Sequence, residues 1–300
     1  MTQEISGVVG IIGIGQLGSA IASNLLDMGY RVVGYRRNRN EAQAFVDAGG
    51  ELVDTPSLVA QQADFIFLCL PNESASNAVL EGVGGILPFL KDGKTVVEVG
   101  TYRKSFKLMQ AEKIQATGAN ILEAELSGSP SLVLARKACF YVGGTDSVYE
   151  KCEPLLQAIT DNHFFLGAFG TAVSMKLIAN YLVTVNTLAA AEAMNLGTRA
   201  GFSPDLLARV LSVGAGASAM MSVRAPIMAS RKFEPAPGSF ITLEKYLDLG
   251  QELVSELGCS APLYAAAVPY FRRAIEQGLQ NEDIAAVIKL LEAESQGDKI

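Results

Sequence analysis

The sequence predicts an α/β domain of the doubly wound Rossmann type, followed by an all-α domain that begins with one long interdomain helix. Two observations support this prediction. In the first half of the chain, short β-branched runs alternate with helical patterns, which is typical of a parallel sheet covered by helices. After about Leu166 these runs disappear and helical spacing continues. With 300 residues, 49% of them apolar, the chain can form two domains, which we place at residues 1–166 and 167–300.

Periodicity places the elements of the first domain. Runs of β-branched and apolar residues predict strands, and apolar residues at helical spacing between them predict helices. The strand–helix–strand order favours a parallel sheet. The predicted strands are Val8–Ile12, Arg31–Tyr35, Asp64–Leu70, Lys94–Val99, Asn120–Glu125 and Cys139–Val142, and the predicted helices are Leu17–Met28, Glu41–Ala48, Ser105–Thr117 and Ser147–Ile159.

The second domain is predicted to begin with a long helix. The residues from Thr171 to Ala200 are apolar and contain few helix breakers. A helix that is apolar on most of its surface needs cover from several neighbours or from another subunit. Pro204, Gly214-Ala215-Gly216 and Pro235–Gly238 mark turns between the later helices.

Charge and cysteine usage exclude several classes of protein. The net charge is −7 and there is no long basic run, which argues against nucleic acid or a membrane surface as the partner and favours a small molecule. The 4 cysteines form no CxxC pair, which favours reduced thiols in a cytoplasmic protein. A single histidine, His163, cannot make a metal site by itself, so we expect none. The uncharged stretch Ile5–Leu26 is long enough for a membrane anchor, but its glycines would break a spanning helix.

The first predicted strand leads into a glycine-rich turn, Gly13-Ile14-Gly15-Gln16-Leu17-Gly18, and then into a helical run. This strand–turn–helix context is that of the dinucleotide-binding GxGxxG pattern. Gly13 permits the tight turn, Gly15 lets the backbone approach a pyrophosphate, and Gly18 allows the helix to pack close to the sheet. The phosphates would bind the free amides at the start of the helix. The sequence therefore predicts a dinucleotide site at this turn.

The end of the second predicted strand indicates which dinucleotide is preferred. A carboxylate about twenty residues after the first glycine would favour NAD. The chain has Arg36 and Arg37 there instead, and arginine offers the 2′-phosphate of NADP a bidentate, charge-assisted partner. NADPH is therefore favoured over NADH. A solvated basic turn is the alternative.

A lysine interrupts the apolar run from Phe164 to Ala191. Lys176, Asn180 and Thr184 follow one another at helical spacing, so they lie on one face of the predicted helix. Burying an ammonium group is costly without partners, which favours a site or the edge of a cleft. A lysine that extends along a helix surface to solvent fits the position equally well.

Motifs in order along nearly the whole chain carry a resemblance. They are the glycine turn, Leu70-Pro71-Asn72, Glu123–Ser129, Gly167–Gly170 with Lys176 and Asn180, Lys245-Tyr246-Leu247, Gly258–Pro262 and Asp283. Together they resemble the β-hydroxyacid dehydrogenase family, which includes 3-hydroxyisobutyrate dehydrogenase, tartronate semialdehyde reductase and the glyoxylate/succinic semialdehyde reductases. The resemblance implies a nicotinamide-dependent enzyme that interconverts a small hydroxy acid and its aldehyde or keto acid by hydride transfer.

The resemblance also implies roles for individual residues. Protonated Lys176 would donate to the developing alkoxide, and Asn180 would hold the lysine or the substrate oxygen. Taken alone, Ser127–Pro130 is an ordinary turn after a strand, and Lys245 is a surface lysine. In the family pattern, Ser127, Gly128 and Ser129 would bind the substrate carboxylate, Thr101 would lie near substrate and nicotinamide, and Leu70, Pro71 and Lys245 would lie near the cofactor.

Four residues depart from the family's usual pattern. Ser129 and Arg136 stand where glycine is usual or common, Ala179 replaces the first of two asparagines, and Tyr246 replaces an aspartate. We expect these changes to crowd or re-polarise the substrate region, so they bear on the identity of the substrate more than on the reaction type. The resemblance and the apolar long helix together imply a homodimer through that helix, with a tetramer as the alternative.

Two other functions fit the same layout. Imine reductases share the two domains and NADPH but usually carry Asp or Tyr where this chain has Lys176. A non-catalytic NADPH-binding sensor or scaffold also fits, since a fold does not guarantee a function. The four departures favour the scaffold hypothesis, and the retained Lys176 and Asn180 weigh against it.

Overall fold

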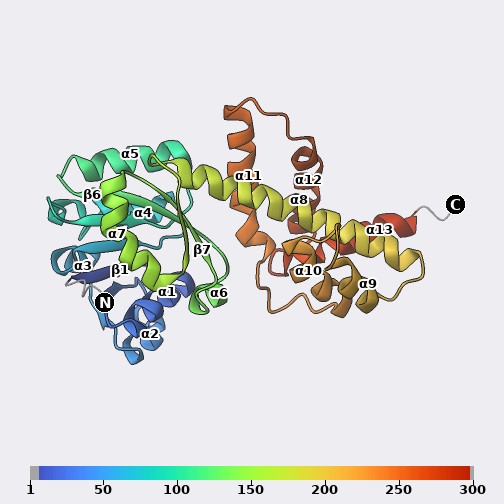
Figure 1. The fold of residues 1–300 in the computed structure, drawn as a ribbon, viewed down its shortest axis with the longest axis horizontal. Helices are drawn as coiled ribbons and strands as arrows, with labels where there is room; N and C mark the ends of the chain where they lie inside the picture. Colours follow the sequence, from blue (N-terminus) through green and yellow to red (C-terminus); the bar gives the residue numbers. More distant parts are fainter. Residues whose placement is uncertain (1–6, 298–300) are drawn as a thin grey trace. The chain divides into compact units, whose positions relative to one another are not determined.

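The computed structural model describes residues 7–297, which form two compact units that divide between Lys176 and Leu177 (Figure 1). The division lies inside the long helix α8 (Thr171–Arg199), which begins in the first unit. The domain boundary at residues 166 and 167 stays a prediction from the sequence.

One eight-stranded sheet forms the centre of the first unit, in the order β3-β2-β1-β4-β5-β6-β7-β8. The strands from β3 to β6 pair in parallel, in the strand order of the doubly wound dinucleotide-binding fold. β7 is antiparallel to β6, and β8 is parallel to β7. The strands are β1 (Val8–Ile12), β2 (Arg31–Tyr35), β3 (Glu51–Leu52), β4 (Phe65–Leu68), β5 (Thr95–Glu98), β6 (Asn120–Ser127), β7 (Cys139–Gly143) and β8 (Asn162–Phe165).

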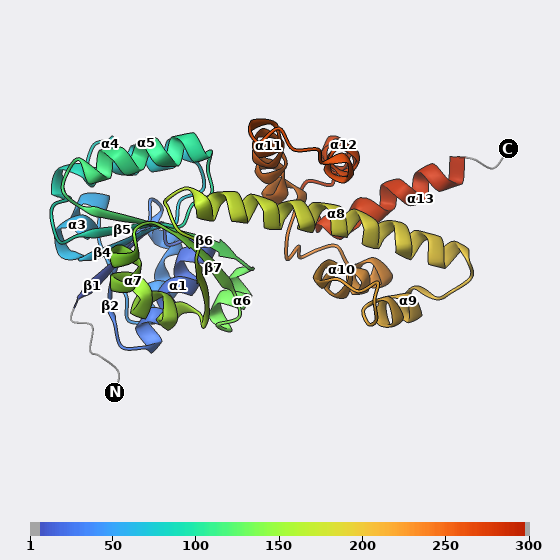
Figure 2. The same cartoon turned by 45° about the horizontal axis from the view of Figure 1, so that its top comes forward.

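Helices cover both faces of this sheet (Figure 2). One core packs the sheet against α1, α2, α6 and α7, and a second core packs the other face against α3, α4 and α5. On the first face lie α1 (Gln16–Asp27), α2 (Gln43–Asp47), α6 (Pro130–Leu134) and α7 (Asp146–Ile159); on the second lie α3 (Pro56–Gln62), α4 (Glu73–Glu81) and α5 (Lys104–Gln115).

The second unit is helical, and a third core joins α8 to the helices that follow it. Inside this unit a buried ion pair connects Arg224 and Asp283. Asp283 also accepts hydrogen bonds from the backbone amides of Gly238, at 3.1 Å, and Ala285, at 2.9 Å. The later elements are α9 (Pro204–Leu211), α10 (Ala219–Ser230), α11 (Phe240–Glu256), α12 (Pro262–Glu276), the 3₁₀ turn η3 (Ile284–Val287) and α13 (Ile288–Gly297).

By length and composition, α8 could also cross a membrane, with a mean hydropathy of 1.2. A core helix passes the same test, and 44% of the apolar window of α8 is buried within the protein. Leu188, Ala191 and Met194 of α8 belong to the core of the second unit. We therefore interpret α8 as a core helix.

The predicted fold class is confirmed, and β1 and β2 have the predicted bounds. The antiparallel direction of β7 differs from the predicted parallel sheet, because the connection from Ser127 to Cys139 is too short for a parallel crossover. Two strands were missed, since β3 has two residues and β8 has no β-branched residue. Three helices were missed as well: α3 and α6 are short, and α4 is largely polar.

Candidate functional site

A cavity of about 870 Å³ opens in the first unit at the carboxyl ends of β1, β2, β4 and β5. Ligands of open α/β sheets bind at this edge. All the predicted cofactor residues from Gly13 to Gly18 line the cavity, as do Arg36, Arg37, Leu70 and Pro71. After β5, Val99 and Gly100 complete the lining, and Thr101 follows directly in the chain.

The three glycines of the turn differ in what surrounds them. Gly13 has a left-handed φ of +106°, and a Cβ there would lie 2.3 Å from the carbonyl oxygen of Cys69. A Cβ on Gly18 would lie 2.1 Å from the carbonyl oxygen of Gly13. A Cβ on Gly15 would meet no atom within 4 Å. Gly13 and Gly18 therefore permit the close packing of turn and helix, whereas Gly15 leaves open space in front of the first amides of α1.

The two arginines after β2 lie differently. The guanidinium of Arg36 donates to the carbonyl oxygen of Ile14 at 2.5 Å and pairs with Glu41. Arg36 is therefore held against the glycine turn. Arg37 is exposed at the cavity. Arg36 is thus a positive charge in a fixed position, and Arg37 is a positive charge exposed at the cavity.

The wall after β4 is held by buried groups. Tyr102 is buried, and its hydroxyl donates to the carbonyl oxygen of Leu70 at 3.0 Å. Asn72 caps α4 by accepting from the amide of Ala75 at 2.9 Å. Burial, together with the charge of Glu98, raises the pKa of the Cys69 thiol far above its ordinary value, so this cavity residue holds its proton at neutral pH.

Cys139 is paired with Ser127 and lies within the electrostatic influence of Lys176. Ser127 ends β6 and pairs across the ladder with Cys139 of β7. Burial raises the pKa of the Cys139 thiol, and the nearby charge of Lys176 lowers it in part. Lys176 is buried, with 8% of its surface exposed. The first unit therefore brings an ammonium group close to the strand pair that carries Ser127.

The two parts of the chain match two family models. Residues 8–167 match the NAD binding domain of 6-phosphogluconate dehydrogenase, and residues 170–291 match "NAD-binding of NADP-dependent 3-hydroxyisobutyrate dehydrogenase". The mitochondrial 3-hydroxyisobutyrate dehydrogenase of Mus musculus is 29% identical, over 95% of this chain and 87% of that protein. Glyoxylate/succinic semialdehyde reductase 2 of Arabidopsis thaliana is 30% identical, over 95% and 79%. The chain belongs to the β-hydroxyacid dehydrogenase family.

Solved structures agree with this assignment. A 3-hydroxyisobutyrate dehydrogenase from Salmonella typhimurium superposes with a TM-score of 0.85 at 25% identity, over 94% of this chain and 99% of that one. An imine reductase from Streptomyces aurantiacus superposes with a TM-score of 0.62 at 20% identity, which shows a shared fold. As a family member, the protein is an oxidoreductase with an NAD-binding domain of the Rossmann type.

Two departures from the family pattern have local structural partners. The hydroxyl of Ser129 caps α6 through the amide of Leu132, at 3.4 Å, and lies 2.8 Å from the hydroxyl of Ser131. Arg136 has a left-handed φ of 57°, which explains why glycine suits that position. The Arg136 side chain donates to the carbonyl oxygens of Gln157 and Ala158 and pairs with Asp161, all at the end of α7. This side chain is therefore bound at the end of α7, and the expected effect of Arg136 on the substrate region stays a prediction.

The remaining predicted residues belong to the second unit. Asn180 follows Lys176 by one turn of α8, and its carbonyl oxygen accepts from the Thr184 hydroxyl at 3.0 Å. The ammonium of Lys245, on α11, lies 5.2 Å from the centre of the Tyr246 ring. The roles of Asn180, Ala179, Lys245 and Tyr246 stay predictions. Among residues 7–297, no group of three or more His, Cys, Asp or Glu side chains is arranged so that it could hold a metal ion.

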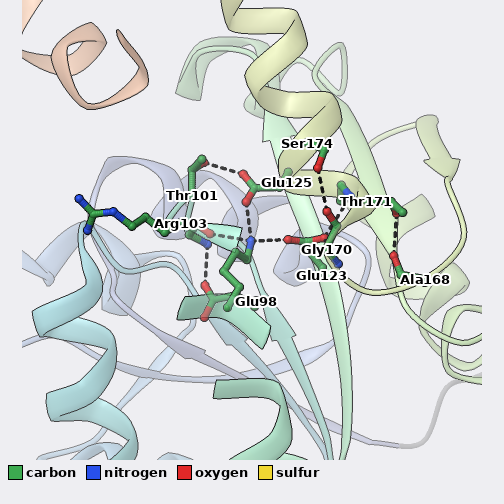
Figure 3. Close-up of polar contacts among 12 residues, drawn as sticks. Glu98, Thr101, Arg103, Glu123, Glu125, Ala168, Gly170, Thr171 and Ser174 are labelled. Carbon is green, nitrogen blue, oxygen red and sulfur yellow. Dashed lines mark hydrogen bonds and ion pairs between the residues drawn. The ribbon is translucent and has the colours of Figure 1, made fainter. Parts of the chain in front are cut away.

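Sequence reasoning missed a buried ionic cluster beside Thr101 (Figure 3). Lys107 of α5 and the carboxyl groups of Glu98, Glu123 and Glu125 are all buried. The Thr101 hydroxyl donates to Glu125 Oε2 at 2.5 Å. A signal was present in the sequence, because acidic residues interrupt two strands that were predicted to be buried on both faces. Their partner could not be identified without the fold.

Proposed function

We propose that the protein interconverts a small hydroxy acid and its aldehyde or keto acid, with NADPH as the preferred coenzyme and Lys176 as the acid/base. The observation that carries this proposal is the burial of Lys176 beside the strand pair of Ser127 and Cys139. A buried ammonium group at the edge of the sheet where the dinucleotide cavity opens is suited to proton transfer.

The cavity fits a dinucleotide. Gly15 has no Cβ to obstruct a pyrophosphate, and the first amides of α1 lie behind it. The volume of about 870 Å³ lies in the range of cofactor sites. NADPH, when bound there, supplies the hydride that reduces the carbonyl carbon.

The chain's own residues bind the substrate and move the proton. Lys176 donates a proton to the substrate oxygen in reduction and accepts it in oxidation. Asn180, one turn further along α8, orients the lysine or the substrate oxygen. Ser127 offers a hydroxyl and Gly128 a backbone amide to the substrate carboxylate. Gly128 has a left-handed φ of +146°, and a Cβ there would lie 3.0 Å from the Cβ of Ala138. Both features require glycine at this position.

The coenzyme preference rests on Arg36 and Arg37. Arg36 is fixed to the glycine turn by Ile14 and balanced by Glu41, and Arg37 is exposed at the same cavity. Two guanidinium groups beside an adenosine ribose attract a 2′-phosphate, because arginine binds phosphate through charge-assisted, bidentate hydrogen bonds.

The test is turnover followed by removal of the lysine. The purified protein is expected to oxidise NADPH with a member of a panel of short aldehydes and keto acids that includes glyoxylate and succinic semialdehyde. Lys176→Ala is expected to lower kcat at least ~100-fold, the effect of losing an acid/base catalyst, while NADPH still binds. The matched control is Lys94→Ala, since Lys94 is also buried in the first unit but donates to the carbonyl oxygen of Ala63. Absence of turnover, or a full rate in Lys176→Ala, would refute the proposal.

The proposed assembly is a homodimer through α8, with a tetramer as the alternative. Ile178, Leu182 and Leu196 of this helix are exposed in the single chain. Large exposed apolar side chains that repeat along one helix favour association with a second copy. Sedimentation equilibrium at micromolar protein concentration measures the subunit number.

A further inference from the structure

The buried ionic cluster found beside Thr101 has an unusual composition for a protein interior. Lys107, Glu123 and Glu125 have fully buried side chains, and Glu98 is 4% exposed. One ammonium group therefore faces three carboxyl groups. Burial raises the pKa of Glu98 to about 8, against the opposing charge of Lys107, so Glu98 retains its proton at neutral pH. Such a cluster stabilises a fold weakly, because apolar residues of the same volume often stabilise it as well or better.

Lys107 is the centre of the cluster. Its ammonium donates to the carbonyl oxygen of Gly100 at 2.9 Å and to Glu125 Oε1. It also lies 2.8 Å from Glu123 Oε1, in an ion pair that lacks hydrogen-bond alignment. Burial acts to lower the pKa of Lys107, but the three carboxyl groups raise it above its ordinary value, so the ammonium stays charged.

The hydrogen bonds of the cluster reach two parts of the candidate site, the cavity residue Gly100 and the start of α8. Glu98 Oε1 accepts from the amide of Gly100 at 2.7 Å, so both backbone polar groups of this cavity residue are held by buried side chains. Glu123 Oε2 accepts from the amides of Gly170 and Ala172, at 2.9 and 3.0 Å (Figure 3). These amides begin α8, and Lys176 lies one turn after Ala172.

Glu125 determines the direction of one hydrogen bond. The Thr101 hydroxyl has a single hydrogen, and it is donated to Glu125 Oε2. Glu125 Oε1 accepts from Lys107, so both carboxylate oxygens of Glu125 are occupied by donors. The Thr101 oxygen can therefore accept a hydrogen bond from a ligand but has no hydrogen left to donate to one.

We propose that this cluster is a positioning device for the reacting end of the site, in which Glu125, held by Lys107, makes Thr101 a hydrogen-bond acceptor. Thr101 then selects a ligand group that carries N–H or O–H and disfavours a bare carboxylate at the same place. Two ligand groups have this chemistry: the carboxamide of the coenzyme and the hydroxyl of the hydroxy acid. The inference rests on the proposed function for the identity of both ligands.

Glu125→Gln is the informative substitution because it keeps the shape of the side chain. Lys107 can only donate, so the amide oxygen of the new side chain must face Lys107 and its NH₂ group must face Thr101. The Thr101 oxygen then accepts from that NH₂ group, and its hydrogen is released to point at the ligand. The substitution is expected to invert the preference of Thr101.

Calorimetric binding of two coenzymes reads out this inversion without turnover. NADP⁺ carries the carboxamide, and nicotinic acid adenine dinucleotide phosphate carries a carboxylate in its place. The native protein is expected to bind NADP⁺ more tightly than the carboxylate analogue. Glu125→Gln is expected to reduce this preference, measured as the dissociation constant of the analogue divided by that of NADP⁺, at least ~5-fold, which is ~1 kcal/mol. In a Thr101→Val background, Glu125→Gln is expected to leave the ratio unchanged. The control Lys94→Met, at another buried lysine, is expected to keep the native ratio.

A second measurement, of KM, distinguishes the two ligand groups. If the hydroxyl of the substrate is the donor, Glu125→Gln leaves the coenzyme ratio unchanged but raises KM, with NADP⁺, for the hydroxy acid that corresponds to the best carbonyl substrate of the panel, and the Thr101→Val background abolishes that rise. Equal weakening of both coenzymes, or an effect of the same size without the Thr101 hydroxyl, would show a structural role and overturn the inference. An unchanged ratio together with an unchanged KM overturns it too. Failure of the proposed function alone, with no turnover by the native protein, leaves the coenzyme comparison intact.

Discussion

Arg36 shows how one side chain can act on both the fold and coenzyme choice. Its guanidinium is bound to Ile14 and Glu41, so it is ordered before any ligand arrives. An ordered cation loses less conformational entropy when a phosphate binds than a flexible one does. Arg39 offers a comparison, because it pairs with Asp54 and does not line the cavity.

Replacing Arg36 by aspartate should therefore separate the two coenzymes. Arg36→Asp is expected to raise the dissociation constant of NADPH ~10- to 100-fold, the effect of losing hydrogen bonds to a charged group, and to leave that of NADH within about twofold. Fluorescence titration with each coenzyme measures this. Arg39→Asp is the control and should change neither constant. A similar loss for both coenzymes would show that Arg36 only supports the turn.

At the scale of elements, local sequence patterns predicted the strands and helices whose formation depends on neighbouring residues in the chain. The bounds of β1 and β2 and the long helix α8 follow from apolar runs and from the glycines between them, and these were predicted correctly. The elements that were missed, such as β3 and β8, owe their structure to pairing with a neighbouring strand. The ionic cluster joins α5 to β5 and β6, and no spacing in the sequence indicates that Lys107 meets Glu125. Such contacts depend on the tertiary fold.

The turn between β1 and α1 permits a test of separate roles for neighbouring glycines. Gly15 has an extended backbone, with φ −96°, and open space around a Cβ, so Gly15→Ala is expected to leave the melting temperature within ~2 °C and to weaken NADPH binding at least ~10-fold by obstructing the pyrophosphate. Gly18→Ala places a Cβ against the Gly13 carbonyl, so it is expected to lower the melting temperature by several degrees.

Scanning calorimetry and NADPH titration of both variants give the two readouts. Gly29→Ala is unsuitable as a control because Gly29 has a left-handed φ of +85°. Ser19→Ala, on the first turn of α1, is a better one and should keep both properties near native values. Tight NADPH binding by Gly15→Ala would contradict the assigned position of the pyrophosphate.

For the molecule as a whole, the ionic cluster makes the stability of the first unit depend on pH. Glu98 faces Lys107 from α5, Glu123 and Glu125 from β6, and Cys69 and Tyr102 from the neighbouring segments. Burial raises its pKa from an ordinary value of 4.5 to about 8. Between these values the folded protein holds a proton that the unfolded chain has released. The free energy of unfolding therefore falls as pH rises through this window, because the unfolded state binds fewer protons.

Removing the titrating group should reduce this slope. Between pH 5 and pH 8 the melting temperature of the native protein is expected to fall, and the fall in Glu98→Gln is expected to be smaller by at least ~2 °C, as measured by scanning calorimetry. Burial also raises the pKa of Glu125, so part of the slope should persist in the variant. Glu112→Gln, at an exposed position on α5, is the control and should keep the native slope. An equal slope in native protein and Glu98→Gln would mean that Glu98 is already ionised in the folded state and does not titrate in this window.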